Sequence, residues 1–135
     1  MASIRKVLEV NAPPAAAWDA LRDVGAVHLR LAPGFVVDCR MDAQDRIVTF
    51  ANGFVAREVI VDLDDAAMRL AYSARSERLQ HHHASFQVFD EGNGRCRVVW
   101  IADVLPHAAA QTVGAMMEQG AAVMTKTLES HSKAA

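Results

Sequence analysis

Apolar residues in the last quarter of the chain recur at three- and four-residue steps, which predicts one long helix over residues 107–132. The apolar stripe consists of Val113, Met116, Met117, Gly120, Val123, Met124 and Leu128. Methionine is unbranched and fills irregular space, whereas leucine at these positions would specify a tighter core. Gly120 costs about 1 kcal/mol relative to alanine in a helix, so we expect it to relieve crowding. The helix therefore either closes over a cavity or packs on a sheet with methionine as filler.

Upstream of this helix the apolar period changes to two, which predicts strands. One strand is expected at residues 4–10, and six more follow in succession at 35–41, 46–51, 54–63, 68–74, 80–89 and 97–105. The dipeptide Asn52-Gly53 between two of these strands is the strongest hairpin signal in the chain. Sequential strands joined by tight turns form an antiparallel sheet.

Two short helices are expected between the first strand and the other six, at about residues 13–23 and 26–31. Pro13 and Pro14 suit the first turn of the first helix, and Gly25 ends it. The predicted order is one strand, two helices, six strands and a final helix. Helices gathered at the ends and on one face of an antiparallel sheet define an α+β fold. A chain of 135 residues fits one domain over 1–135.

Charge and composition narrow the possible partners. The formal net charge is −2 and no basic tract is present, which argues against nucleic acid as a partner. No apolar run approaches the ~18–20 residues that cross a bilayer, and the start of the chain has no apolar segment typical of a secretory signal. Cys39 and Cys96 are far apart and not in a metal-binding spacing. We expect a cytoplasmic protein without membrane insertion, cofactor or metal. The edge strands of the sheet offer a route to a homodimer.

Three consecutive histidines at residues 81–83 open a predicted strand. His81 and His83 share one face of such a strand and His82 takes the other. Two imidazoles at this spacing bind zinc only with a third ligand, and no cysteine or carboxylate is locally spaced to supply one. The open alternatives are a proton-transfer role for one histidine at a cavity mouth, with His83 as the candidate, or partly exposed rings at the start of the strand.

Two acids interrupt apolar strands. If Glu58 points inward, it is a candidate general acid or base. If it faces solvent, it pairs with a cross-strand arginine such as Arg69. Asp103 lies on the strand face opposite Trp100, and it is either a salt-bridged structural group or a polar group of a cavity. Trp100 and Tyr72 each combine a large ring with one polar atom, which suits either core packing or the orientation of an aromatic ligand.

Several strings of the sequence carry a family resemblance. They are 10–14 followed by Trp18, Asn52-Gly53 followed by Arg57-Glu58, residues 69–73, and Val99-Trp100 leading to Leu105-Pro106. The chain resembles the START-like superfamily, also called SRPBCC, which includes Bet v 1-like pollen allergens and polyketide cyclase/dehydrase-like proteins. The resemblance covers nearly the whole chain. It implies a helix-grip fold, in which a curved antiparallel sheet of about seven strands surrounds a long C-terminal helix and leaves a hydrophobic cavity between them.

The resemblance implies one main function and two alternatives. We predict binding of a hydrophobic small molecule, lipid-like or polycyclic aromatic, in that cavity. The first alternative is a polyketide cyclase/dehydrase-type enzyme that uses Glu58, Asp103 or His83, and the second is a protein-interaction module. The predicted ligand-binding residues are Phe50, Phe54, Tyr72, His83, Trp100, Val113, Met116, Met117, Gly120 and Met124. A one-residue error in strand register would turn every inward residue outward.

Overall fold

Seven strands form one antiparallel sheet in the computed structural model, which describes residues 2–77 and 79–134, with side chains as far as residue 131. The strands are β1 (Ala2–Val10), β2 (Val36–Asp42), β3 (Asp45–Phe50), β4 (Val55–Asp64), β5 (Arg69–Arg75), β6 (His81–Gly92) and β7 (Arg95–Leu105). Their order in the sheet is β1-β7-β6-β5-β4-β3-β2, so β1 and β2 are the two edges. The predicted antiparallel sheet and its order along the chain are confirmed.

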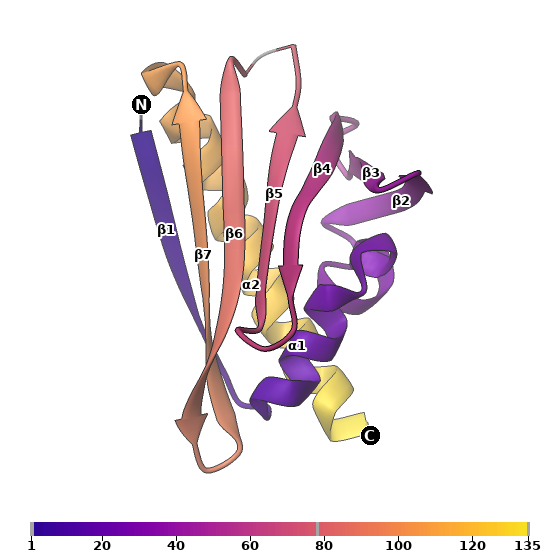
Figure 1. Cartoon of the computed structure of the whole chain (residues 1–135), viewed down its shortest axis with the longest axis vertical. Coiled ribbons are helices and arrows are strands. Elements are labelled where there is room, and N and C mark those ends of the chain that lie inside the picture. Colours follow the sequence, from indigo (N-terminus) through magenta and orange to yellow (C-terminus); the bar gives the residue numbers. More distant parts are fainter. Residues whose placement is uncertain (1, 78, 135) are drawn as a thin grey trace.

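The helical segments lie on one face of this sheet and at its end (Figure 1). They are α1 (Pro14–Arg22), the 3₁₀ turn η1 (Val24–Ala26), the π-helical turn η2 (Val27–Leu31), the 3₁₀ turn η3 (His107–Ala109) and α2 (Ala110–Ala134). In Figure 1, α2 crosses the sheet diagonally on its far side. The short helix expected at 26–31 is thus two tight turns, and Leu29 within it is 62% exposed.

Polar contacts fix the helices against the strands. The indole Nε1 of Trp18 donates to Asp65 Oδ1 at 2.9 Å, which ties α1 to the turn between β4 and β5. Lys6 Nζ on β1 bonds Glu118 Oε2 on α2 at 2.6 Å. About three turns further along α2, Glu129 Oε2 accepts a hydrogen bond from the Asn11 backbone amide at 2.7 Å. These contacts hold α2 along β1, at one edge of the sheet.

The side chains beneath α2 pack unevenly along its length. Near the C-terminal half, Met124 and Leu128 are buried against a closely packed core that contains Leu21 and Val27. Near the N-terminal half, Val113 and Met116 are only partly buried. The apolar side chains of α2 are therefore more deeply buried toward its C-terminal half than at its start.

Candidate functional site

A cavity of about 80 Å³ lies between the N-terminal half of α2 and the concave face of the sheet. We call it the central cavity. Its walls are formed by Phe35, Phe50, Phe54, Ala56, Glu58, Tyr72, Ala74, Ser76, Leu79, His82, Trp100, Val113, Met116 and Met117. Most of these side chains are apolar, and the polar ones include Glu58 on β4, Tyr72 on β5, Ser76 just after β5 and His82 on β6.

Two further hollows adjoin the central cavity. The outer pocket, of about 370 Å³, opens beside η3 and shares Phe54, Leu79, Val113 and Met116 with the central cavity. The inner void, of about 40 Å³, lies toward η2 and is bordered by Met124. The central cavity shares wall residues with both of the other hollows, and those shared side chains divide them.

Stacked rings make the inner surface of the sheet flat and apolar. Phe86 and Trp100 stack at 4.8 Å between ring centroids, and Tyr72 lies over Phe86 at 6.1 Å. These three residues come from β5, β6 and β7, whose register brings Phe86 directly opposite Trp100. Phe35 and Phe50 meet edge to face at 5.5 Å on the opposite wall. Tyr72, Trp100, Phe35 and Phe50 line the central cavity, so a guest there would contact aromatic rings, whereas Phe86 borders the inner void.

A buried ion pair lies where the central cavity meets the inner void. Arg46 Nε on β3 donates to Glu58 Oε1 on β4 at 2.7 Å, and the two residues are directly opposite in the strand register. The Arg46 side chain is 3% exposed and the Glu58 side chain 11%. Arg46 also donates to the Val24 carbonyl at 3.2 Å, and its guanidinium lies 5.1 Å from the centroid of the Tyr72 ring. The pair contributes polarity but no net charge to the cavity wall.

The Tyr72 phenol is held by a ring on a nearby strand. Trp100 Nε1 donates to the Tyr72 oxygen at 3.1 Å. Burial raises the pKa of Tyr72 far above its ordinary value, and the nearby Glu58 carboxylate raises it further. The phenol therefore keeps its proton at neutral pH and remains a hydrogen-bond donor.

His82 is the histidine of the cavity wall. Its imidazole lies 6.2 Å from the Tyr72 ring between centroids. The buried Nδ1 atom has no hydrogen-bond partner among the described residues. Burial lowers the pKa of His82, while the Glu58 carboxylate acts in the opposite direction. The ring is therefore neutral at pH 7 and presents one donor and one acceptor nitrogen.

Several predicted site residues do line the central cavity: Phe50, Phe54, Glu58, Tyr72, Trp100, Val113, Met116 and Met117. The alternative in which Glu58 faces solvent and pairs with Arg69 is wrong, because Glu58 is buried and its partner is Arg46. Gly120 on α2 lies against the rings of Phe35 and Trp100. A Cβ atom at Gly120 would be 3.1 Å from Phe35, so the expected relief of crowding is confirmed.

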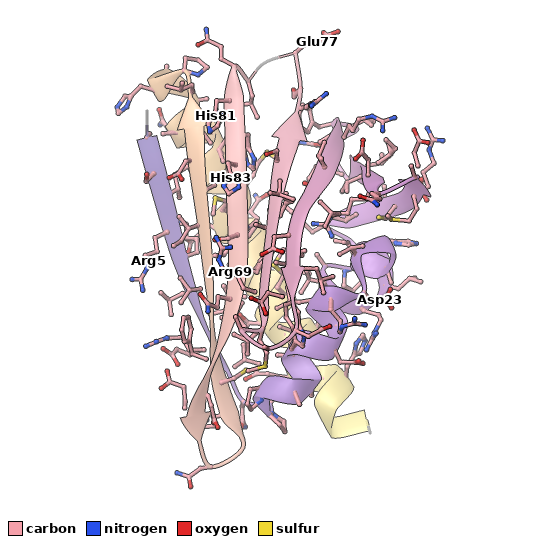
Figure 2. All side chains as sticks on the ribbon, in the orientation of Figure 1. Arg5, Asp23, Arg69, Glu77, His81 and His83 are labelled. Atoms are coloured by element: carbon pink, nitrogen blue, oxygen red, sulfur yellow. The ribbon has the colours of Figure 1, made fainter. Side chains whose placement is uncertain are left out.

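The register confirms the expected position of Asp103 on the strand face opposite Trp100, and it corrects the alternatives in which Asp103 or His83 acts inside the cavity. These two residues are paired across β6 and β7 on the face opposite to that of Trp100. The Ser3 hydroxyl donates to Asp103 on that outer face. Figure 2 shows the sheet from the side away from α2, with His83 labelled on β6. The described residues contain no group of three or more His, Cys, Asp or Glu side chains that would hold a metal ion.

Sequence patterns did not identify His82 and Phe35 in the wall of the central cavity, or Arg46 in the wall of the inner void. A signal for His82 is present in the sequence, because Ala84, Phe86 and Val88 alternate with polar residues and have the same parity as His82. No comparable signal exists for Phe35, which follows Gly34 in the loop before β2.

Solved structures with the same fold define the structural class. A START superfamily protein from Mycobacterium smegmatis superimposes with a TM-score of 0.76 at 14% identity, covering 98% of this chain and 97% of that chain. A protein from Thermobifida fusca, determined by solution NMR, has a TM-score of 0.77 at 26% identity, with 96% and 91% covered. The Zhui aromatase/cyclase from Streptomyces sp. R1128 has a TM-score of 0.70 at 16% identity, with 98% and 93% covered. The protein thus has the START-like helix-grip fold.

The sequence model of the family described as polyketide cyclase / dehydrase and lipid transport matches residues 1–130. The chain belongs to this family. No curated protein sequence gives a significant match. None of the helices in the described part of the chain is long and apolar enough to cross a membrane. Pairing of two chains through the β1 or β2 edge stays a prediction.

Proposed function

We propose that the protein binds a hydrophobic small molecule, lipid-like or polycyclic aromatic, in the central cavity and the adjoining outer pocket. The observation that carries this proposal is an apolar chamber with a few convergent polar groups that adjoins a larger pocket at the surface. The family's description, which includes both polyketide chemistry and lipid transport, is consistent with such a guest.

The size of the hollows limits how a guest can enter. An apolar cavity of roughly 150 Å³ takes benzene in another protein, and the central cavity is about 80 Å³. A ring must therefore displace part of the wall or extend into the outer pocket. Met116 lies in the wall between the two, and an unbranched methionine side chain adapts easily to a new neighbour.

Burial of apolar surface supplies the affinity. A guest that buries roughly 200 Å² gains about 5 kcal/mol at 25 cal/mol per Å². Before the cost of association is subtracted, this gain corresponds to a Kd on the order of 0.2 mM, which is the tightest binding that this area alone supports. Guests that also fill the outer pocket bind more tightly, because they remove more apolar surface from water.

A cyclase/dehydrase-type activity is the second candidate, favoured by the neutral His82 in the cavity wall and by the likeness to an aromatase/cyclase. Of the acid–base candidates, Glu58 lies in the same wall, but its Oε1 is held by Arg46. A proton-transfer role for Glu58 would require this bond to loosen. Binding without turnover is therefore the function we favour.

Titration with N-phenyl-1-naphthylamine, a neutral dye that fluoresces in apolar surroundings, tests the binding proposal. We expect saturable fluorescence and a dye-dependent rise in Tm. Two variants on β5 form a matched pair, because Ala74 lines the cavity and the neighbouring Ser73 lies on the outer face. Ala74→Leu should weaken dye binding, and Ser73→Leu should leave it unchanged. Absence of saturable binding by the wild-type protein, or equal binding by both variants, would refute the proposal.

A further inference from the structure

The polar side chains that line the central cavity include Glu58, Tyr72 and His82, and the first two have identified partners. Glu58 is bonded to Arg46 at 2.7 Å. The Tyr72 oxygen accepts a hydrogen bond from Trp100 at 3.1 Å. His82 is different, because its buried Nδ1 has no partner among the residues that the structure describes. Buried polar atoms in folded proteins are nearly always paired, so a buried imidazole without a partner calls for an explanation.

Among the described residues no other residue supplies a partner for this nitrogen, and the hydrogen bonding that acts on the pKa of His82 comes from its own backbone. His82 is opposite Val104 in the β6–β7 register, and a valine side chain has no polar atom. The residues of α2 that reach the cavity, Val113, Met116 and Met117, are also apolar. The charged or titratable groups near the ring are Glu58 on β4, Tyr72 on β5, and His81 and His83 on its own strand.

The charges of the cavity decide which polar group a guest can carry. Arg46 and Glu58 cancel one another, and burial keeps His82 neutral. A carboxylate guest would bring an uncompensated charge into an apolar chamber, which is strongly unfavourable. A pure hydrocarbon would fill the chamber but leave the imidazole unpaired. A neutral hydroxyl group satisfies both requirements, since it adds no charge and donates to the acceptor nitrogen of the ring.

We infer that His82 makes the cavity selective for guests that carry a phenolic or enolic hydroxyl group, and that it accepts the hydrogen bond from that hydroxyl. This inference rests on the proposed function, because it assigns a role within the same cavity. A hydroxyl on an unsaturated carbon is more acidic than an alcohol hydroxyl and is therefore the better neutral donor to an imidazole. The rings of Tyr72 and Trp100, which line the central cavity, suit the flat molecule that carries it. His82 is thus a specificity-determining residue of this site.

Binding of three naphthalene derivatives to the wild-type protein measures this selectivity. We expect 2-naphthol to bind about five- to ten-fold more tightly than naphthalene, which is the range for one net hydrogen bond. We expect 2-naphthoate to bind more weakly than both. If none of the three binds, the proposed function itself fails. If 2-naphthol and naphthalene bind with equal Kd, the cavity binds guests but His82 does not select among them, and the inference is overturned.

Variants at neighbouring positions of β6 assign the selectivity to one side chain. His82→Phe keeps an aromatic ring but removes both nitrogens, so it should lose the five- to ten-fold preference for 2-naphthol while naphthalene affinity stays within about two-fold. His82→Gln keeps an acceptor and should retain part of the preference. His83→Phe, on the outer face, should retain all of it. An unchanged preference in His82→Phe would refute the assignment.

A measurement on the wild-type protein covers the case in which His82→Phe does not fold. Saturation with 2-naphthol should shift the imidazole ¹⁵N resonances of His82 and leave those of His83 in place. Naphthalene should shift the His82 nitrogens far less, because it has no proton to donate. Equal ¹⁵N shifts at His82 with both guests would mean that no hydrogen bond forms, and the inference would be wrong.

Discussion

Removal of one partner of the buried ion pair should destabilise the protein much more than removal of both. Glu58→Gln leaves the Arg46 guanidinium, which is 3% exposed, without its carboxylate at 2.7 Å. Breaking such a pair from one side costs about 3–5 kcal/mol. Arg46 retains the Val24 carbonyl and the Tyr72 ring, so we expect a loss near the lower end, about 3 kcal/mol.

The double variant Arg46→Met/Glu58→Leu removes both charges and keeps the apolar volume. We expect its free energy of unfolding to lie within about 1 kcal/mol of wild type, since an ion pair of this kind is commonly replaced by hydrophobic residues at little cost. Urea unfolding followed by circular dichroism measures all variants, with unchanged m-values as the condition for comparing them.

The matched control is the same substitution in an exposed pair. Glu118 on α2 bonds Lys6, and its side chain is 73% exposed. Glu118→Gln should therefore cost less than about 1 kcal/mol. The reasoning is refuted if Glu58→Gln costs no more than Glu118→Gln, or if the double variant is as unstable as the single one.

Three further predictions concern the rest of the site and core. Gly120→Ala gains about 1 kcal/mol of helix propensity, but its Cβ crowds Phe35, which lines the central cavity. Stability should therefore change little, while dye affinity should fall because Phe35 must shift. Unchanged dye affinity would contradict this. The pKa of His82 is lower in the folded protein than in the unfolded chain, so the unfolded state binds more protons as the pH falls. The free energy of unfolding therefore decreases. The contribution of His82 is complete above pH ~6.5 and is lost as the pH falls through the folded pKa. His82→Gln should therefore flatten the stability curve of urea unfolding between pH ~7.5 and ~5, and an unchanged slope would argue against it. Leu21→Ala should cost about 2–5 kcal/mol in urea unfolding, because Leu21 is 1% exposed in the closely packed core.

The fold was largely predictable from local patterns. The alternation of apolar residues marks the strands, and tight turns such as Asn93-Gly94, with φ of 57° and 72°, close consecutive hairpins. Strand ends were less predictable, since β6 continues to Gly92 with a register shift after Asp90. Bulges of this kind depend on cross-strand packing that a single sequence does not contain.

The site was predictable only in part. The large apolar rings of Tyr72 and Trp100 predict that both face inward. His83 was assigned to the cavity, but the alternation of side chains along β6 places His82 on the inward face instead. The buried position of Arg46 could not be recognised from its residue type, because arginine is rarely buried. Its burial depends on the register that brings Glu58 opposite to it. The cavity volume depends on how side chains from several elements meet, which no local pattern encodes.

Methyl NMR of methionine during a titration with naphthalene tests the central claim, a guest-accessible hollow beneath α2. Met116 and Met117 line the central cavity, whereas Met41 is 44% exposed on β2 and serves as an internal control. The account predicts saturable shifts of the Met116 and Met117 methyl resonances with a single Kd, and no shift of Met41. Resonances that stay fixed to the solubility limit of naphthalene, or that all move together without saturation, would contradict it.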